Sequence, residues 1–132
     1  MTLSLPLLLQ YECPEVIAYF SHHQQLPKPV VEQRFKDLLA WFWLSEHRKQ
    51  QGKKTALFGP LLPLDDLWHA FILHTRAYTH FSHQFFGDYY HHDIEPLGEE
   101  YSLSEADLRD LLQDCFEHLG KEWVERCFAG LL

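Results

Sequence analysis

The chain has 132 residues, of which 46% are hydrophobic and 15% aromatic, and its formal net charge is -8 at pH 7. This length and apolar content exclude an intrinsically disordered chain and predict a single compact domain over residues 1–132. The acidic balance argues against binding to nucleic acid or to anionic membranes, because both partners require a basic face.

Helical spacing of apolar residues is common along the chain and strand-like alternation is scarce, so we expect an all-α fold of about five helices. The first expected helix begins at Pro14, which suits a first helical turn, and ends before Pro27. The second covers residues 30–52 and is expected to end at Gly52. Its apolar stripe consists of Val31, Phe35, Leu38, Leu39 and Phe42.

The third expected helix runs unbroken from Asp65 or Asp66 to about Phe85, and Gly87 is expected to end it. The fourth covers residues 102–120, where Ser104 and Asp107 resemble a capping box. The fifth covers residues 121–132. The buried faces expected for the last two helices comprise Leu108, Leu111, Leu112, Cys115 and Leu119, and then Trp123, Val124, Cys127 and Phe128.

The three cysteines, Cys13, Cys115 and Cys127, are widely spaced and form no CxxC motif. This usage predicts free thiols and a cytoplasmic protein. The first ten residues are apolar but lack the basic stretch and small-residue cleavage site of a signal peptide, so we do not expect one. No run approaches 18 uncharged apolar residues, so we expect no membrane span.

Six of the ten histidines lie within residues 62–96. On the expected helix, Asp65 precedes His69 by four residues and Asp66 precedes it by three, so either carboxylate shares a face with this imidazole. A carboxylate and an imidazole at this spacing can bind one divalent ion such as zinc. The carboxylate can equally serve to orient the imidazole.

His80 and His83 form a second pair, which would lie about 16 Å from His69 along a straight helix and could not share its ion. His91 and His92 follow in an irregular segment. Chain length favours their docking beside His80 and His83, because a return to His69 requires an almost fully extended connection. Shielding from water by apolar neighbours favours the His69 pair, so both arrangements stay open.

The predicted metal ligands are Asp65, Asp66, His69, His91 and His92, and the expected cofactor is a divalent metal such as zinc. Alternatively, these side chains form a polar cluster without metal, because histidines on apolar helix faces often serve as hydrogen-bonded core residues. The sequence contains no HExxH, GxSxG or P-loop pattern, so no enzyme class is predicted.

A second hypothesis is a protein-interaction module. Aromatic side chains exceed what a small core needs, and aromatics are favoured at interface centres. The aromatic residues in question are Trp41, Trp43, Tyr89, Tyr90 and Trp123. This hypothesis predicts a protein partner or self-association, with histidines that are structural or make association sensitive to pH.

The stretch DDLWHAFILHTRAY, residues 65–78, resembles the WH-containing segment of the glycine-rich domain-containing protein-like family, whose pattern reads D-x-x-WH-x-H-x-L-x-P-x-x-Y. Positions that match are Asp65 or Asp66, Trp68, His69, Leu73 and Tyr78. Phe71 replaces the second histidine of that pattern, and Thr75 replaces its proline. The continuation FGDYYHHDIEP is similar to bacterial relatives that carry a terminal HH. The resemblance implies a helical segment with a candidate site, and no particular reaction.

Overall fold

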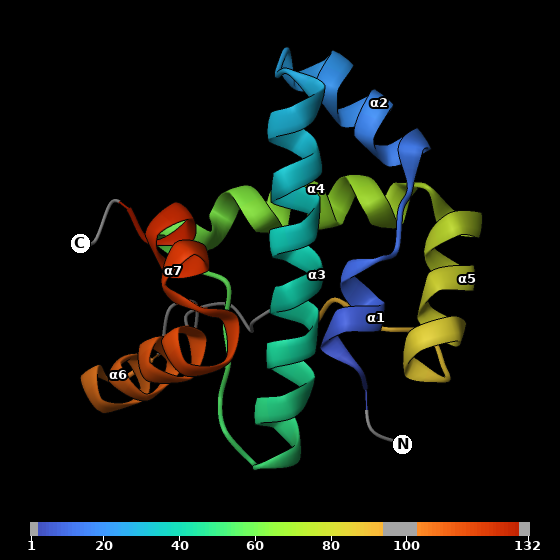
Figure 1. Cartoon of the computed structure of the whole chain (residues 1–132). Coiled ribbons are helices and arrows are strands. Elements are labelled where there is room, and N and C mark those ends of the chain that lie inside the picture. The colour runs from blue at the N-terminus through green and yellow to red at the C-terminus, as the bar shows by residue number, and fades with distance from the viewer. Residues whose placement is uncertain (1–2, 94–102, 130–132) are drawn as a thin grey trace. The chain divides into compact units, whose positions relative to one another are not determined.

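The computed structural model describes residues 3–93 and 103–129 (Figure 1). The described residues form seven α-helices, one 3-10 turn and one π-helical turn, without strands, which confirms the all-α prediction but not the number of about five helices. The internal contacts divide the chain into two compact units. Unit 1 comprises residues 1–43 and 63–91, and unit 2 comprises residues 44–62 and 92–132. The single-domain prediction therefore stays a prediction.

The first helix, α1 (Leu5–Leu9), is absent from the sequence-based prediction. Its five residues are too few to show a helical repeat, and so short a helix needs support from outside. Ser4 caps its N-terminus, and the indole Nε1 of Trp43 donates a hydrogen bond of 2.9 Å to the carbonyl of Leu3. Tertiary contacts in unit 1 thus stabilise α1.

The next two helices are α2 (Pro14–Gln24) and α3 (Lys28–Gln50), close to the predicted limits. All five residues of the apolar stripe predicted for α3 are buried. Gly52 adopts a φ of 71°, and the amide of Lys53 donates a 3.0 Å hydrogen bond to the carbonyl of Arg48. Gly52, in this left-handed conformation, therefore ends α3, as the sequence predicts.

The predicted unbroken helix from residue 65 to residue 85 is wrong. Two helices occupy this stretch, α4 (Leu62–Leu73) and α5 (Thr75–Phe86), and His74 separates them with φ -83° and ψ 68°. The Nδ1 atom of His74 hydrogen-bonds the carbonyl of Ala70 at 2.8 Å. The imidazole thereby supplies a donor to one of the free carbonyls at the end of α4, so the helix ends without glycine or proline. Gly87, with φ 78°, ends α5 as expected.

Aromatic rings fill the interior of unit 1. Ring centroids lie 4.9 Å apart in the pair of Phe42 and Trp68, and 5.2 Å apart in the pair of Phe35 and Phe71. These pairs join α3 to α4, which cross in Figure 1. Aromatic pairs at such separations add to the stability from area burial by about 0.5–1.5 kcal/mol each. The outer face of α4, which carries the candidate site, is therefore held in place by a packed inner face.

Unit 2 contains the 3-10 turn η1 (Gly59–Leu61), α6 (Glu105–Asp114), the π-helical turn η2 (Cys115–Leu119) and α7 (Lys121–Cys127). The Oγ atom of Ser104 accepts a 3.1 Å hydrogen bond from the amide of Asp107, so the predicted N-terminal cap of α6 is confirmed. The predicted continuous helix over residues 102–120 is wrong in its last turn, which is π-helical. The predicted irregular segment that carries His91 and His92 is non-helical as far as residue 93, and its continuation lies outside the described residues.

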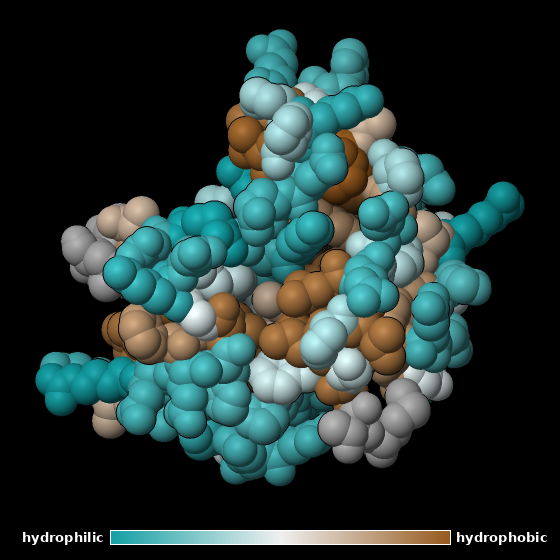
Figure 2. Space-filling model, in the orientation of Figure 1, coloured by the Kyte–Doolittle hydropathy of each residue, from teal (hydrophilic) through white to brown (hydrophobic). Residues whose placement is uncertain are grey.

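Of the residues predicted to be buried in unit 2, Leu111, Cys115, Trp123, Val124 and Phe128 are buried. The other four are only half-buried, namely Leu108, Leu112, Leu119 and Cys127. All three cysteines are free thiols, as predicted. Hydrophilic residues cover most of the surface seen in Figure 2. None of the helices in the described parts of the chain is long and apolar enough to cross a membrane.

Candidate metal centre

The first element of the centre is a pair of side chains on α4. The Nε2 atom of His69 lies 3.5 Å from the Oδ2 atom of Asp65, as expected for residues one turn apart on the same face. Trp68 and Phe71 are buried in the core of unit 1, so the side chain of His69 points outward and is 57% exposed. The expected shielding of this imidazole by its apolar neighbours is therefore wrong, because those neighbours face the other side of the helix.

The second element is a hydrogen-bonded bridge that fixes the segment after α5. The Nε1 atom of Trp68 donates a 3.0 Å hydrogen bond to the hydroxyl of Tyr78, and this hydroxyl donates to the backbone carbonyl of Tyr90. Burial raises the pKa of Tyr78 to about 12, so the hydroxyl keeps its proton, and can donate, into the alkaline range. The bridge ties α4, α5 and the returning segment together.

The ring of Tyr90 adds a second anchor for the same segment. Its centroid lies 4.2 Å from that of Phe86 and 5.7 Å from that of Trp68, both in stacked arrangements, and 5.2 Å from that of Phe42. Gly87, in the left-handed conformation, ends α5 just before this contact. Tyr90 is therefore held by its carbonyl and its ring, and the residues that follow it start from a fixed position.

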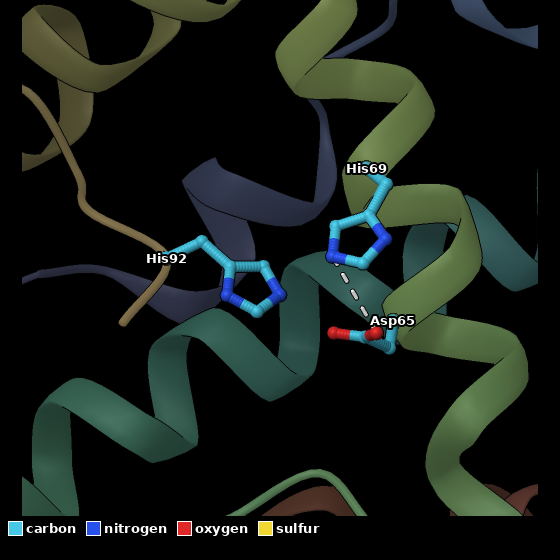
Figure 3. Close-up of side chains that lie close together, drawn as sticks. All are labelled: Asp65, His69 and His92. Atoms are coloured by element: carbon cyan, nitrogen blue, oxygen red, sulfur yellow. Dashed lines mark ion pairs between the residues drawn. The ribbon is translucent and has the colours of Figure 1, made fainter. Parts of the chain in front are cut away.

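His92 is the third element. It follows His91, the last residue of unit 1, by one peptide bond. One ligand atom from each of Asp65, His69 and His92 lies within 4.8 Å of the others. Figure 3 shows the His92 side chain extending from the returning segment toward the α4 pair. Two stretches of chain that are more than 20 residues apart thus present two imidazoles and one carboxylate to a common space.

Two of the five predicted ligands are not part of this group. Asp66 is exposed and lies about 100° around the α4 axis from Asp65. His91 is exposed, and its ring packs against Tyr89 with the centroids 4.9 Å apart. Adjacent residues of an extended chain point to opposite sides, which explains why His92 joins the group and His91 does not.

The alternative position for the terminal histidine pair, beside His80 and His83, is not observed. Both residues are exposed on α5, where they line a shallow groove with Thr75, Arg76 and Thr79. Within the described chain, neither belongs to a group of three side chains placed to share an ion. A straight helix would have put His69 too far from the end of α5, but the break at His74 redirects α5 and shortens the path back to His69.

A second group of ligand-type side chains was missed by sequence reasoning. Asp114, Glu117 and His118, all in unit 2, also place one ligand atom each within 4.8 Å of the others. The spacing of three and four residues after Asp114 is the signal that could have identified them, since it puts all three side chains on one helical face.

The aromatic residues of the interaction hypothesis are mostly engaged in packing. Trp41 and Trp123 are buried, and Trp43 and Tyr90 are half-buried. Tyr89 alone of the five is exposed. The premise of an exposed aromatic surface made by these residues is therefore wrong, while the expectation of a partner or of self-association stays a prediction.

Comparison with known proteins points to a family. A family model described as UCP032817-like matches residues 8–120, which is most of the chain. No curated protein and no solved structure matches. The description of the family names no reaction, ligand or partner, and the match lends no support to the resemblance of residues 65–78 to the glycine-rich domain-containing protein-like family.

Proposed function

The chain belongs to the UCP032817-like family, and we propose that it binds one divalent transition-metal ion through Asp65, His69 and His92. The observation that carries the proposal is the convergence of these three side chains from α4 and from the segment anchored by Tyr90. Zinc is the first ion to test.

The donor set suits such an ion. Two imidazoles and one carboxylate with an open position occur in catalytic zinc sites and in non-haem iron sites. Metal–ligand bonds of about 2 Å place neighbouring donors roughly 3.3 Å apart in a tetrahedral site. His69 and Asp65 are already 3.5 Å apart, so chelation requires mainly a rotation of the His92 side chain.

Exposure of His69 supports an open coordination position. Its side chain is 57% exposed, so the metal would face solvent on this side. Structural zinc sites have four protein ligands, whereas three protein ligands leave a place for water. We therefore expect water as the fourth ligand.

The experiment is a zinc titration of chelator-treated protein against a competing fluorescent chelator. Loss of a residue that only orients a metal ligand lowers metal affinity by roughly 10–100-fold. His69→Ala removes a ligand, so it should lower the affinity for zinc by more than this. His80→Ala is the matched control, because His80 is an exposed imidazole that belongs to neither ligand group. Equal affinity in wild type, His69→Ala and His92→Ala would reject the proposal.

Two further expectations form part of the proposal. The three free thiols support a cytoplasmic location, where thiols stay reduced, and cell fractionation tests it. The similarity of residues 65–78 to the WH-containing pattern supports a functional role for Asp65 and His69, which both fall on that pattern.

A further inference from the structure

A second group of side chains lies in unit 2, at the junction of α6 and the π-helical turn η2. We propose that Asp114, Glu117 and His118 form a second divalent-metal site, independent of the one on α4. Their ligand atoms lie within 4.8 Å of one another. Two carboxylates and one imidazole are the mixed oxygen and nitrogen donors that zinc and manganese accept.

The π-helical turn places two of these donors. The amide of Gly120 donates to the carbonyl of Cys115, five residues earlier, at 3.2 Å, which widens the turn that carries Glu117 and His118. Such turns are rare and are found frequently at functional sites. Cys115 itself is fully buried and anchors the turn, so the outward side chains of Glu117 and His118 rest on a packed base.

Asp114 is held in a fixed orientation by the cations beside it. Arg48, 1% exposed, contacts the Oδ2 atom of Asp114, and Lys53 lies 3.4 Å from the same oxygen. Within the described chain, both ion pairs of Asp114 use its Oδ2 atom. Its Oδ1 atom can therefore bind a metal ion. Ligating carboxylates are commonly oriented by such hydrogen bonds from an outer shell.

Charge does not forbid a cation at this position. Arg48 and Lys53 are balanced by Asp110 and Asp114, and Glu117 adds one further negative charge. With a neutral histidine, Asp114, Glu117 and His118 together with Arg48, Lys53 and Asp110 carry one net negative charge. The nearby cations repel a metal, however, so we expect weaker binding here than at the α4 site.

His118 is positioned by a second imidazole. The ring centroids of His47 and His118 lie 4.7 Å apart in an edge-to-face arrangement. His47 lies on the part of α3 that belongs to unit 2, and its Nε2 atom lies 3.4 Å from Nε2 of Gln51. The His47 ring limits rotation of the His118 side chain by packing against it. Asp114 and Glu117 supply the other two donors.

The test counts bound zinc in four proteins: wild type, His69→Ala, His118→Ala and the double variant. Equilibrium dialysis of chelator-treated protein should give about two, one, one and no zinc ions per chain. This scheme separates the two proposals, because a failure of the α4 site leaves His69→Ala unchanged while His118→Ala still loses one ion. Equal zinc in wild type and His118→Ala would overturn the second site.

Two further variants serve as a control and as a substitute for His118→Ala. Phe116→Ala is the matched control, because Phe116 is 55% exposed on the same turn and offers no ligand atom; it should keep both ions. If His118→Ala does not fold, Glu117→Gln changes only an exposed side chain and should also lose the second ion. Retention of two ions by Glu117→Gln, with a normal circular dichroism spectrum, would count equally against the site.

Discussion

The indole Nε1 of Trp68 donates a 3.0 Å hydrogen bond to the hydroxyl of Tyr78 across the break between α4 and α5. Both side chains are buried in unit 1. The same hydroxyl donates to the carbonyl of Tyr90, two residues before His92. Because this bridge ends two residues before His92, we expect it to fix the start of the segment that carries this proposed ligand.

Replacing Tyr78 with Phe tests this link. The variant keeps the ring but loses the hydroxyl that accepts from the Trp68 indole and donates to the Tyr90 carbonyl, so we expect a loss of about 0.5–1.5 kcal/mol in the free energy of unfolding for each hydrogen bond. Zinc affinity should fall as well, because His92 loses its fixed starting position. Urea unfolding and zinc titration measure the two effects. Tyr89→Phe, at an exposed position, should change neither.

The sequence predicted those parts of the fold that depend on local pattern. The α3 stripe, the cap at Ser104 and the closing glycines were correct, since each depends on residues within one or two helical turns. The break at His74 was not predictable in this way, because an imidazole replaces the usual glycine or proline and its hydrogen bond to Ala70 is seen only in the structure. Thr75, where the resembling pattern has proline, was the available hint.

Part of the candidate site was likewise predictable. Asp65 and His69 follow from helical spacing alone. The choice of His92 over His91 depends on the direction in which the returning segment leaves Tyr90, and that direction is set by ring contacts across unit 1. Long-range contacts of this kind cannot be read from local sequence, so the sequence left the position of His91 and His92 open.

Arg48 should be a major source of stability in unit 2. It is 1% exposed, pairs with Asp110 at 2.9 Å and with Asp114, and donates to Thr55 and to the carbonyl of Lys54. Arg48→Met would leave buried Asp114 without its main partner, so we expect a loss of about 3–5 kcal/mol in thermal or urea unfolding. Lys53→Met, at a partly exposed position, should cost at most about 1 kcal/mol. Equal costs would show that burial of the arginine does not matter.

Asp110 should contribute to acid unfolding. The hydrogen bond from Arg48 holds the pKa of Asp110 below its usual value in the folded protein. A carboxyl group with a lowered folded pKa stabilises the protein above its unfolded pKa of about 3.9, and this contribution is lost as the pH falls through the folded value. Asp110→Asn should therefore show a shallower loss of stability below about pH 4 than wild type. Glu122→Gln, an exposed carboxyl change in unit 2, should follow the wild-type curve.

The cysteines should differ in reactivity. Burial raises the pKa of the Cys115 thiol to about 12, so almost no thiolate is present at pH 8. Cys127 is only half-buried. With iodoacetamide at pH 8, mass spectrometry should find Cys127 modified before Cys115 in the native protein, and all three cysteines modified after denaturation. Faster labelling of Cys115 would contradict its burial.

The central claim concerns where the metal binds, and anomalous diffraction at the zinc absorption edge tests it most directly. A crystal of the protein grown with zinc should show a peak about 2 Å from Asp65, His69 and the His92 imidazole together. A zinc peak on other histidines alone, or none within reach of His92, would contradict the account.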